Sequence, residues 1–214
     1  MRSIETGGRL ALPVLLAFSF ATTAKAQDEG VKMVEQLTKR AGSTAQAVTE
    51  AKLQFVKTMT AYNAVLADDA KDRKGLYKKL QSEMEDTEKR RADVVKADDA
   101  MKLEADTVFK SWGDSTAAIS NADLKKRSEE RLTKTKARVA DIQAAGQKAA
   151  AAYAPIMNTL KDQVTYLGHD LNAESVASLK KDSAKVNAQA QDLEKLLDEM
   201  VTTINTNTAA LRPQ

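Results

Sequence analysis

Apolar residues recur every three or four positions along four successive stretches of this chain, from Val34 to Leu211. This periodicity is typical of amphipathic helices that bury one face, whereas strands would show alternation. An average spacing of about 3.5 residues favours helices that wrap around one another in a left-handed supercoil. The sequence therefore predicts an all-α fold, an elongated antiparallel bundle of about four long helices with coiled-coil-like packing.

Each stretch supplies one seam of predicted core positions, some of them small or polar. The first seam is Val34, Leu37, Ala41, Thr44, Val48, Ala51, Phe55, Thr58 and Tyr62. The second is Tyr77, Leu80, Met84, Thr87, Arg91, Val94, Asp98, Met101, Ala105, Val108 and Trp112. The third is Leu132, Thr135, Val139, Ile142, Gly146, Ala149, Tyr153, Ile156 and Leu160, followed by Val164 and Leu167. The fourth is Val176, Leu179, Ser183, Val186, Ala190, Leu193, Leu197, Met200, Ile204, Asn207 and Leu211.

Turn-forming residues separate the four stretches. They are Asp68, Asp69, Asp72 and Gly75, then Ser120, Asn121 and Asp123, and finally Gly168 and Asn172. Short connections make neighbouring helices antiparallel. Helices of about 35 to 48 residues would extend roughly 50 to 70 Å at about 1.5 Å per residue. A break of the first helix near Gly42 is left open, because Ser43 and Gln46 have the spacing of a capping box.

The first residues have the features of an export signal. A basic start at Arg2 and Arg9 precedes the apolar run Leu10–Ala21, and Ala24 and Ala26 provide small residues before a cleavage site. We expect residues 1–26 to be removed after Ala26. The alternative is a retained anchor, but a run of about a dozen residues is shorter than the roughly 20 that a spanning helix requires.

This signal predicts a periplasmic protein whose residues 27–214 form one helical-bundle domain without a stable membrane anchor. The chain contains no cysteine. Lipid attachment at a cleavage-site cysteine, disulfides, thiolate metal sites and cysteine nucleophiles are therefore excluded.

The charge balance argues against binding to nucleic acid. The whole chain has 33 Lys and Arg against 30 Asp and Glu, and residues 27–214 retain 30 basic and 29 acidic side chains. A nucleic-acid-binding face needs a surplus of cations that replace the counterions of the phosphates. Here basic and acidic residues alternate along the helices, as in Glu88 followed by Lys89, Arg90 and Arg91. Solvated helix faces with ion pairs account for this pattern.

The only histidine, His169, lies in the last predicted turn, where a helix ends and the next begins. A cation there interacts favourably with the helix dipole and the last carbonyl groups, so we expect a capping role. Metal sites in helical bundles and zinc-protease motifs need more than one histidine. Nucleophile-elbow and phosphate-loop motifs are absent from the sequence. Trp112 occupies a seam position, which favours packing over ligand stacking. No catalytic, cofactor-binding or metal-ligating residue is predicted, and no cofactor.

Two features of the second and third helices give specific expectations. If these helices fold back at Asn121, Arg91 and Asp98 face the run Ala144–Ala154, which is almost entirely alanine. Small residues would then leave room for large polar side chains. Alternatively, Arg91 and Asp98 form a buried polar layer that fixes the register. Pro155 removes one helical hydrogen bond and predicts a kink in the third helix.

The stretch around the last turn resembles a known family. It comprises Asp162, Gln163, Val164, Leu167, His169, Leu171, Asn172, Ala173, Val176, Ala177, Ser178 and Leu179, supported by Trp112, Ser120, Asn121, Leu124, Ser128, Pro155 and Ile156. Over roughly Ala51 to Ile204 the chain is similar to exported bacterial helical proteins of domain-of-unknown-function family 2959. The resemblance implies a helical envelope protein and supplies no activity. Many relatives are lipoproteins, and this chain departs from them because it lacks the cysteine.

These observations favour a non-enzymatic scaffold or adaptor protein of the bacterial cell envelope, acting through protein partners or through self-association. The first helix, whose seam is rich in Ala and Thr, could equally pack on a second copy. The alternative function is a chaperone-like binding module for envelope proteins, which requires an exposed apolar cleft. A catalytic or metal-binding protein centred on His169 is the least favoured hypothesis.

Overall fold

The computed structural model describes residues 20–211, with side chains from residue 30 onward. It contains four helices, α1 (Phe20–Leu66), α2 (Arg73–Ala117), α3 (Ala122–His169) and α4 (Ala173–Ala209), and no strand within the described residues. The helices contain 47, 45, 48 and 37 residues. The predicted all-α fold with four long helices is confirmed.

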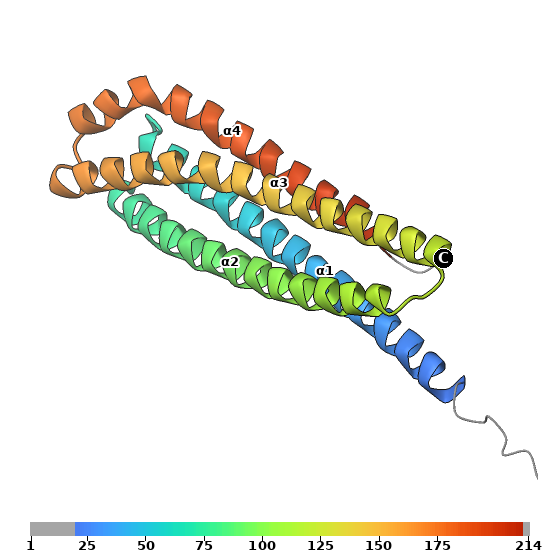
Figure 1. The fold of residues 1–214 in the computed structure, drawn as a ribbon. Helices are drawn as coiled ribbons and strands as arrows, with labels where there is room; N and C mark the ends of the chain where they lie inside the picture. The colour runs from blue at the N-terminus through green and yellow to red at the C-terminus, as the bar shows by residue number, and fades with distance from the viewer. Residues whose placement is uncertain (1–19, 212–214) are drawn as a thin grey trace, which may run out of the picture.

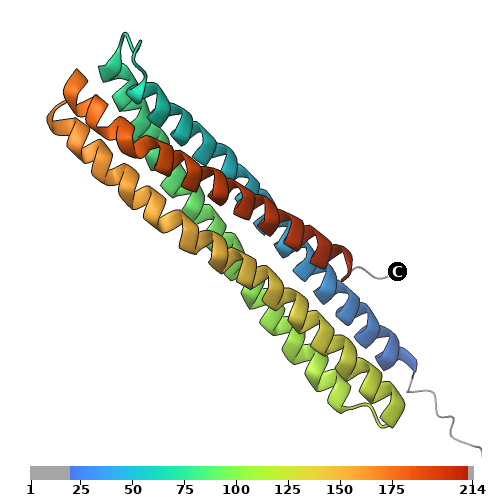
Figure 2. The same cartoon turned by 90° about the horizontal axis from the view of Figure 1, so that it is seen from above.

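The helices run up and down in an antiparallel bundle (Figures 1 and 2). Each packs against two others, with α1 and α3 each contacting α2 and α4. At about 1.5 Å per residue, α3 is roughly 70 Å long, so the molecule is a slender rod. The α1–α2 and α3–α4 turns lie at one end, and the α2–α3 turn lies at the other (Figure 1). We call these the double-turn end and the hairpin end.

Side chains at the predicted turns cap the N-termini of three helices. The Asp72 carboxylate accepts a hydrogen bond from the backbone N–H of Gly75, at 2.9 Å. Asn121 accepts one from Leu124 at 3.1 Å, and Asn172 accepts one from Ser175 at 2.8 Å. The first N–H groups of a helix have no partner inside the helix, so these caps determine where α2, α3 and α4 begin.

The predicted seams form the core. Nearly all of their residues are buried or half-buried, and they gather in two clusters. One cluster, at the double-turn end, includes Tyr62, Leu80, Leu160 and Leu193. The other, toward the hairpin end, includes Leu37, Met101, Ile142 and Ile204. Half-buried Leu197 packs against both clusters and joins them into one core.

The predicted seam of α2 is wrong at Arg91. Between Thr87 and Met101 no α2 residue is buried, and the Arg91 side chain is 57% exposed. Arg91 does lie against the predicted region of α3, because its guanidinium carbon is 5.7 Å from the centre of the Tyr153 ring. However, Arg91 pairs with Glu88 and Asp98 pairs with Lys102, both within α2. A buried polar layer is therefore not formed.

The first and third helices are continuous. α1 runs through Gly42 without a break, which removes the alternative of a fresh start at Ser43. It packs on α2 and α4 of its own chain and buries Phe55 and Tyr62, so its seam does not require a second copy. α3 continues through Pro155, and Figure 1 shows a change of direction in its carboxyl-terminal third, in agreement with the predicted kink.

The predicted signal peptide falls largely outside the described residues, because residues 1–19 are not among them. The backbone of α1 runs through the predicted cleavage position between Ala26 and Gln27. None of the helices in residues 20–211 combines the length and the apolar content of a membrane span.

Candidate functional site

His169 is the last residue of α3 and is exposed to solvent. This position agrees with the predicted place of a cation at a helix C-terminus, although no hydrogen bond joins its ring to the last carbonyl groups. Beside it, Asp170 accepts a hydrogen bond from the Asn172 amide at 2.8 Å, and Asn172 caps α4. No group of three His, Asp or Glu side chains in the described part of the chain could hold a metal ion.

Trp112 joins α2 to α3 near the hairpin end. Its indole N–H donates to the Ser128 hydroxyl at 3.0 Å, and Ser128 also bonds to Thr116 at 2.6 Å. The Arg131 guanidinium lies 5.7 Å from the centre of the Trp112 ring. A half-buried indole with a satisfied N–H and a cation over its face is a packing element, as the seam position predicted.

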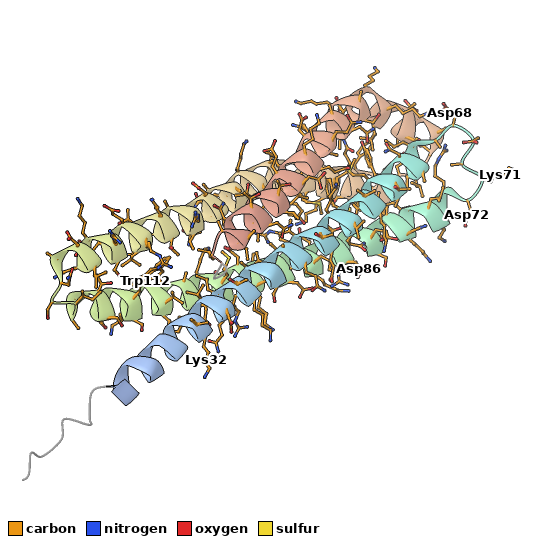
Figure 3. The ribbon with its side chains drawn as sticks, turned by 90° about the vertical axis from the view of Figure 1, so that its right-hand side faces the viewer. Lys32, Asp68, Lys71, Asp72, Asp86 and Trp112 are labelled. Atoms are coloured by element: carbon orange, nitrogen blue, oxygen red, sulfur yellow. The ribbon has the colours of Figure 1, made fainter. Side chains whose placement is uncertain are left out.

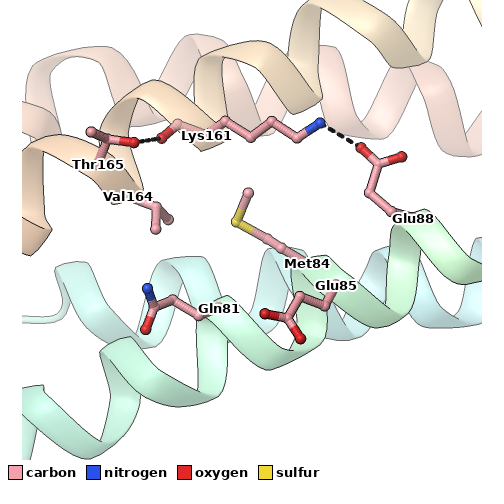
Figure 4. A pocket seen from close by; sticks show the side chains of 7 residues that line it. All are labelled: Gln81, Met84, Glu85, Glu88, Lys161, Val164 and Thr165. Carbon is pink, nitrogen blue, oxygen red and sulfur yellow. Dashed lines mark hydrogen bonds and ion pairs between the residues drawn. The ribbon is translucent and has the colours of Figure 1, made fainter.

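A groove of about 250 Å³ runs between α2 and α3 near the double-turn end. The side chains that line it are Gln81, Met84, Glu85, Glu88, Lys161, Val164 and Thr165 (Figure 4). Met84 and Val164 supply its apolar surface, while the Lys161 ammonium and the Glu88 carboxylate pair across one side at 2.7 Å. The groove is smaller than most ligand sites, which occupy about 300 to 1,000 Å³.

Aromatic hydroxyls lie near both ends of this groove. At one end, the Tyr77 hydroxyl donates to the carbonyl of Val164 at 3.0 Å and accepts from the Gln81 amide at 3.1 Å. At the other, the Tyr153 hydroxyl is buried without a hydrogen-bond partner. Burial and the nearby Glu88 carboxylate raise the pKa of Tyr153 well above its usual value. Tyr153 therefore stays neutral at physiological pH and is not available as a general base.

A polar contact between α1 and α2 lies in the core. The Thr58 hydroxyl is 2.8 Å from that of Thr87 and also 2.8 Å from the carbonyl oxygen of Glu83. The Gln54 amide donates to the Glu83 carboxylate at 2.6 Å. The sequence placed Thr58 and Thr87 in the seams but missed Gln54, since its hydrogen-bond partner lies 29 positions away on another helix. Because these polar groups have partners, the contact fixes how α1 sits on α2.

A second buried polar pair, Tyr62 and Gln163, is poorly satisfied. The Tyr62 hydroxyl and the Gln163 carbonyl oxygen are buried without a well-formed hydrogen bond. Burial raises the pKa of Tyr62 to about 12, and the nearby Gln163 side chain opposes part of that shift. The pair has no exposed nucleophile or base, so it supplies polar packing within the core.

The polar side chains of the groove and of the core therefore either pair with one another, as Lys161 and Glu88 do, or lie buried between the helices. The sequence predicts no catalytic or ligand-binding residue. Within the part of the chain that the structure describes, these side chains form no arrangement of nucleophile, base and orienting group of the kind that acyl transfer requires.

Comparisons with known proteins agree with the resemblance noted in the sequence. No curated protein and no solved structure matches the chain. The family model described as "Protein of unknown function (DUF2959)" matches residues 23–212, which extends the resemblance from Ala51 back to the first turn of α1 and from Ile204 past the end of α4. The chain therefore belongs to the DUF2959 family of proteins of unknown function.

Proposed function

We propose that this chain is a non-enzymatic scaffold or adaptor of the bacterial cell envelope, working in the periplasm after residues 1–26 are removed. The observation that carries the proposal is the length of the rod, since α3 alone extends roughly 70 Å. Two ends separated by that distance, joined by continuous helices, suit a protein that holds partners apart or connects them.

Charged side chains lie at both ends of the rod. Figure 3 shows Asp68, Lys71 and Asp72 at the α1–α2 turn, and Trp112 near the opposite end. The Asp68 carboxylate is bound by Lys180 of α4, so the α1–α2 turn is tied to the bundle. The hairpin end carries Lys125, Lys126 and Arg127 on α3, with Asp123 and Glu129 close by in the sequence. Each end therefore presents charged side chains that a protein partner can recognise.

Photocrosslinking in cells tests this proposal. A photoreactive residue is placed at exposed Lys71, at exposed Ser120 or, as a control, at exposed Lys96 on the side of α2. The scaffold hypothesis predicts discrete products that differ between Lys71 and Ser120 and are weak at Lys96. Many products of all sizes at the three positions would instead indicate a chaperone-like binding module, and no products at either end would contradict both functions.

Cell fractionation tests the location separately. We expect the protein in the periplasmic fraction, with a mass that corresponds to cleavage after Ala26. An intact chain in the cytoplasm would contradict the proposed location, while an intact chain in the membrane fraction would show that the signal is retained as an anchor.

A further inference from the structure

The outward side of α1 carries an uncharged stripe. Seven exposed positions follow one another at alternating intervals of four and three residues, which is the spacing of a coiled-coil seam. They are Gly42, Gln46, Thr49, Leu53, Val56, Thr60 and Asn63. In Figure 3, α1 crosses the front of the bundle, so another helix can approach it from that side.

Leu53 and Val56 form the apolar centre of this stripe, with side chains 59% and 37% exposed. A row with the same spacing along the outward side of α2 has a different charge content. It consists of Lys89, Ala92, Lys96, Asp99, Leu103, Asp106 and Lys110, all exposed, and most of them are charged. Leu103 is 71% exposed but lies between two aspartates of this row. A helix that covered Leu103 would also have to remove water from these carboxylates, which is unfavourable.

The polar side chains of the α1 stripe already have hydrogen-bond partners within the chain. The Thr49 hydroxyl donates to the carbonyl of Ala45 at 2.9 Å, and the Thr60 hydroxyl donates to that of Val56 at 2.8 Å. The Gln46 amide donates to Glu50 at 3.0 Å. Burying a polar group is costly only when it loses its hydrogen bond. This stripe can therefore be covered with little loss of hydrogen bonding.

We propose that the α1 stripe is a self-association surface, on which α1 of a second copy packs in antiparallel orientation. When the stripe is turned end for end against itself, Leu53 lies on Val56 of the second copy. Thr49 then lies on Thr60, and Gln46 lies on Asn63. Apolar side chains then contact apolar side chains, hydroxyls contact hydroxyls, and amides contact amides. An isologous two-fold dimer requires such a self-complementary surface.

The charges beside the stripe favour this orientation. Glu50 and Lys57 lie on the same flank, one heptad apart, so an antiparallel pair brings Glu50 of each copy near Lys57 of the other. A parallel pair would bring Lys52 near Lys57, and like charges would repel. Lys52 is already bonded to Asp198 of α4 and Glu50 to Arg90 of α2, which holds both flanks in place.

Sedimentation of the chain without residues 1–26 tests the surface. All the described members of the two core clusters lie at Met33 or later in the chain. The contact spans a single helix face of roughly 32 Å, so a weak dimer is expected, and the apparent mass should rise toward twice the monomer mass with concentration. Leu53→Glu should weaken self-association at least tenfold. The matched control Leu103→Glu should change it less than twofold. A mass that stays monomeric, or equal effects of the two variants, would overturn the proposal.

Cysteine crosslinking tests the orientation, because the native chain contains no cysteine. In an antiparallel pair, the two copies of position 46 are roughly 26 Å apart, beyond the roughly 7 Å that a disulfide can bridge. Gln46→Cys mixed with Asn63→Cys should therefore form a mixed disulfide, while Gln46→Cys alone should not crosslink. Crosslinking of Gln46→Cys with itself would show a parallel pair and overturn the proposed orientation.

Discussion

Replacing Gly42 with alanine tests whether α1 is one continuous helix. Gly42 is exposed in the interior of α1, and a Cβ built on it meets nothing within 4 Å. Glycine inside a helix is about 0.8 to 1.0 kcal/mol less favourable than alanine. We therefore expect Gly42→Ala to raise the free energy of unfolding by about 1 kcal/mol. For a chain of this size, the corresponding increase in Tm is about 2 to 4 °C.

Thermal unfolding followed by circular dichroism measures this gain, at a concentration where the protein is monomeric. Gly168→Ala in α3 is the matched control, because its Cβ would lie 2.7 Å from the Tyr77 hydroxyl oxygen. Tyr77 would have to give up its hydrogen bond to Val164, so this variant should lose about 1 kcal/mol or more. If Gly42→Ala leaves Tm unchanged or lowers it, a helix that restarts at Ser43 would be the better description.

Three further substitutions, the first with a matched control, test the core and a cap. Leu160→Ala should lower the unfolding free energy by about 2 to 5 kcal/mol in urea, while Leu103→Ala should change it by less than about 0.5; equal losses would contradict the seams. Tyr62→Phe should be neutral or slightly stabilising, since the hydroxyl lacks a hydrogen bond. The pKa of Tyr62 is raised from 10.0 to about 12, so its hydroxyl loses the proton at a lower pH in the unfolded chain than in the native protein. The free energy of unfolding should therefore fall as the pH rises from 10.0 to about 12, and this fall should be smaller for the Phe variant. Asn172→Ala should lower Tm through a loss of about 1 kcal/mol, and an unchanged Tm would argue against the cap.

Much of the fold could be predicted because helical periodicity and turn chemistry are local. Each seam repeats over ten turns or so, and the side chains that cap α2, α3 and α4 belong to the turns themselves. Burial of residues such as Leu80, Ile142 and Leu193 follows from their place in the repeat.

The middle of α2 could not be predicted from its repeat. Arg91 occupies a seam position by spacing, yet its long side chain reaches past the core to the Tyr153 ring and to Glu88. The charged guanidinium avoids the cost of burial in this way. Which residues of α2 and α3 are buried here therefore depends on how the two helices pack, and not on the spacing of the repeat. The groove lined by Met84 and Val164 lies next to this boundary, and the sequence alone contains no local pattern that marks it.

The polar contacts between helices were missed for a related reason. Gln54 and Gln163 are buried although neither lies on a predicted seam position. Their burial depends on which residues of other helices lie opposite them, and that register is a property of the whole bundle. The outward stripe of α1 is different, since its spacing is visible in the sequence, but its exposure had to come from the fold.

Small-angle X-ray scattering from the monomeric protein tests the central claim, an elongated single-chain rod, most directly. A rod about 70 Å long has a radius of gyration of roughly 22 Å or more. A compact globular chain of 214 residues would have one of about 17 Å. We predict the larger value, with a maximum dimension above about 70 Å. A radius near 17 Å would contradict the rod and the scaffold function proposed from it.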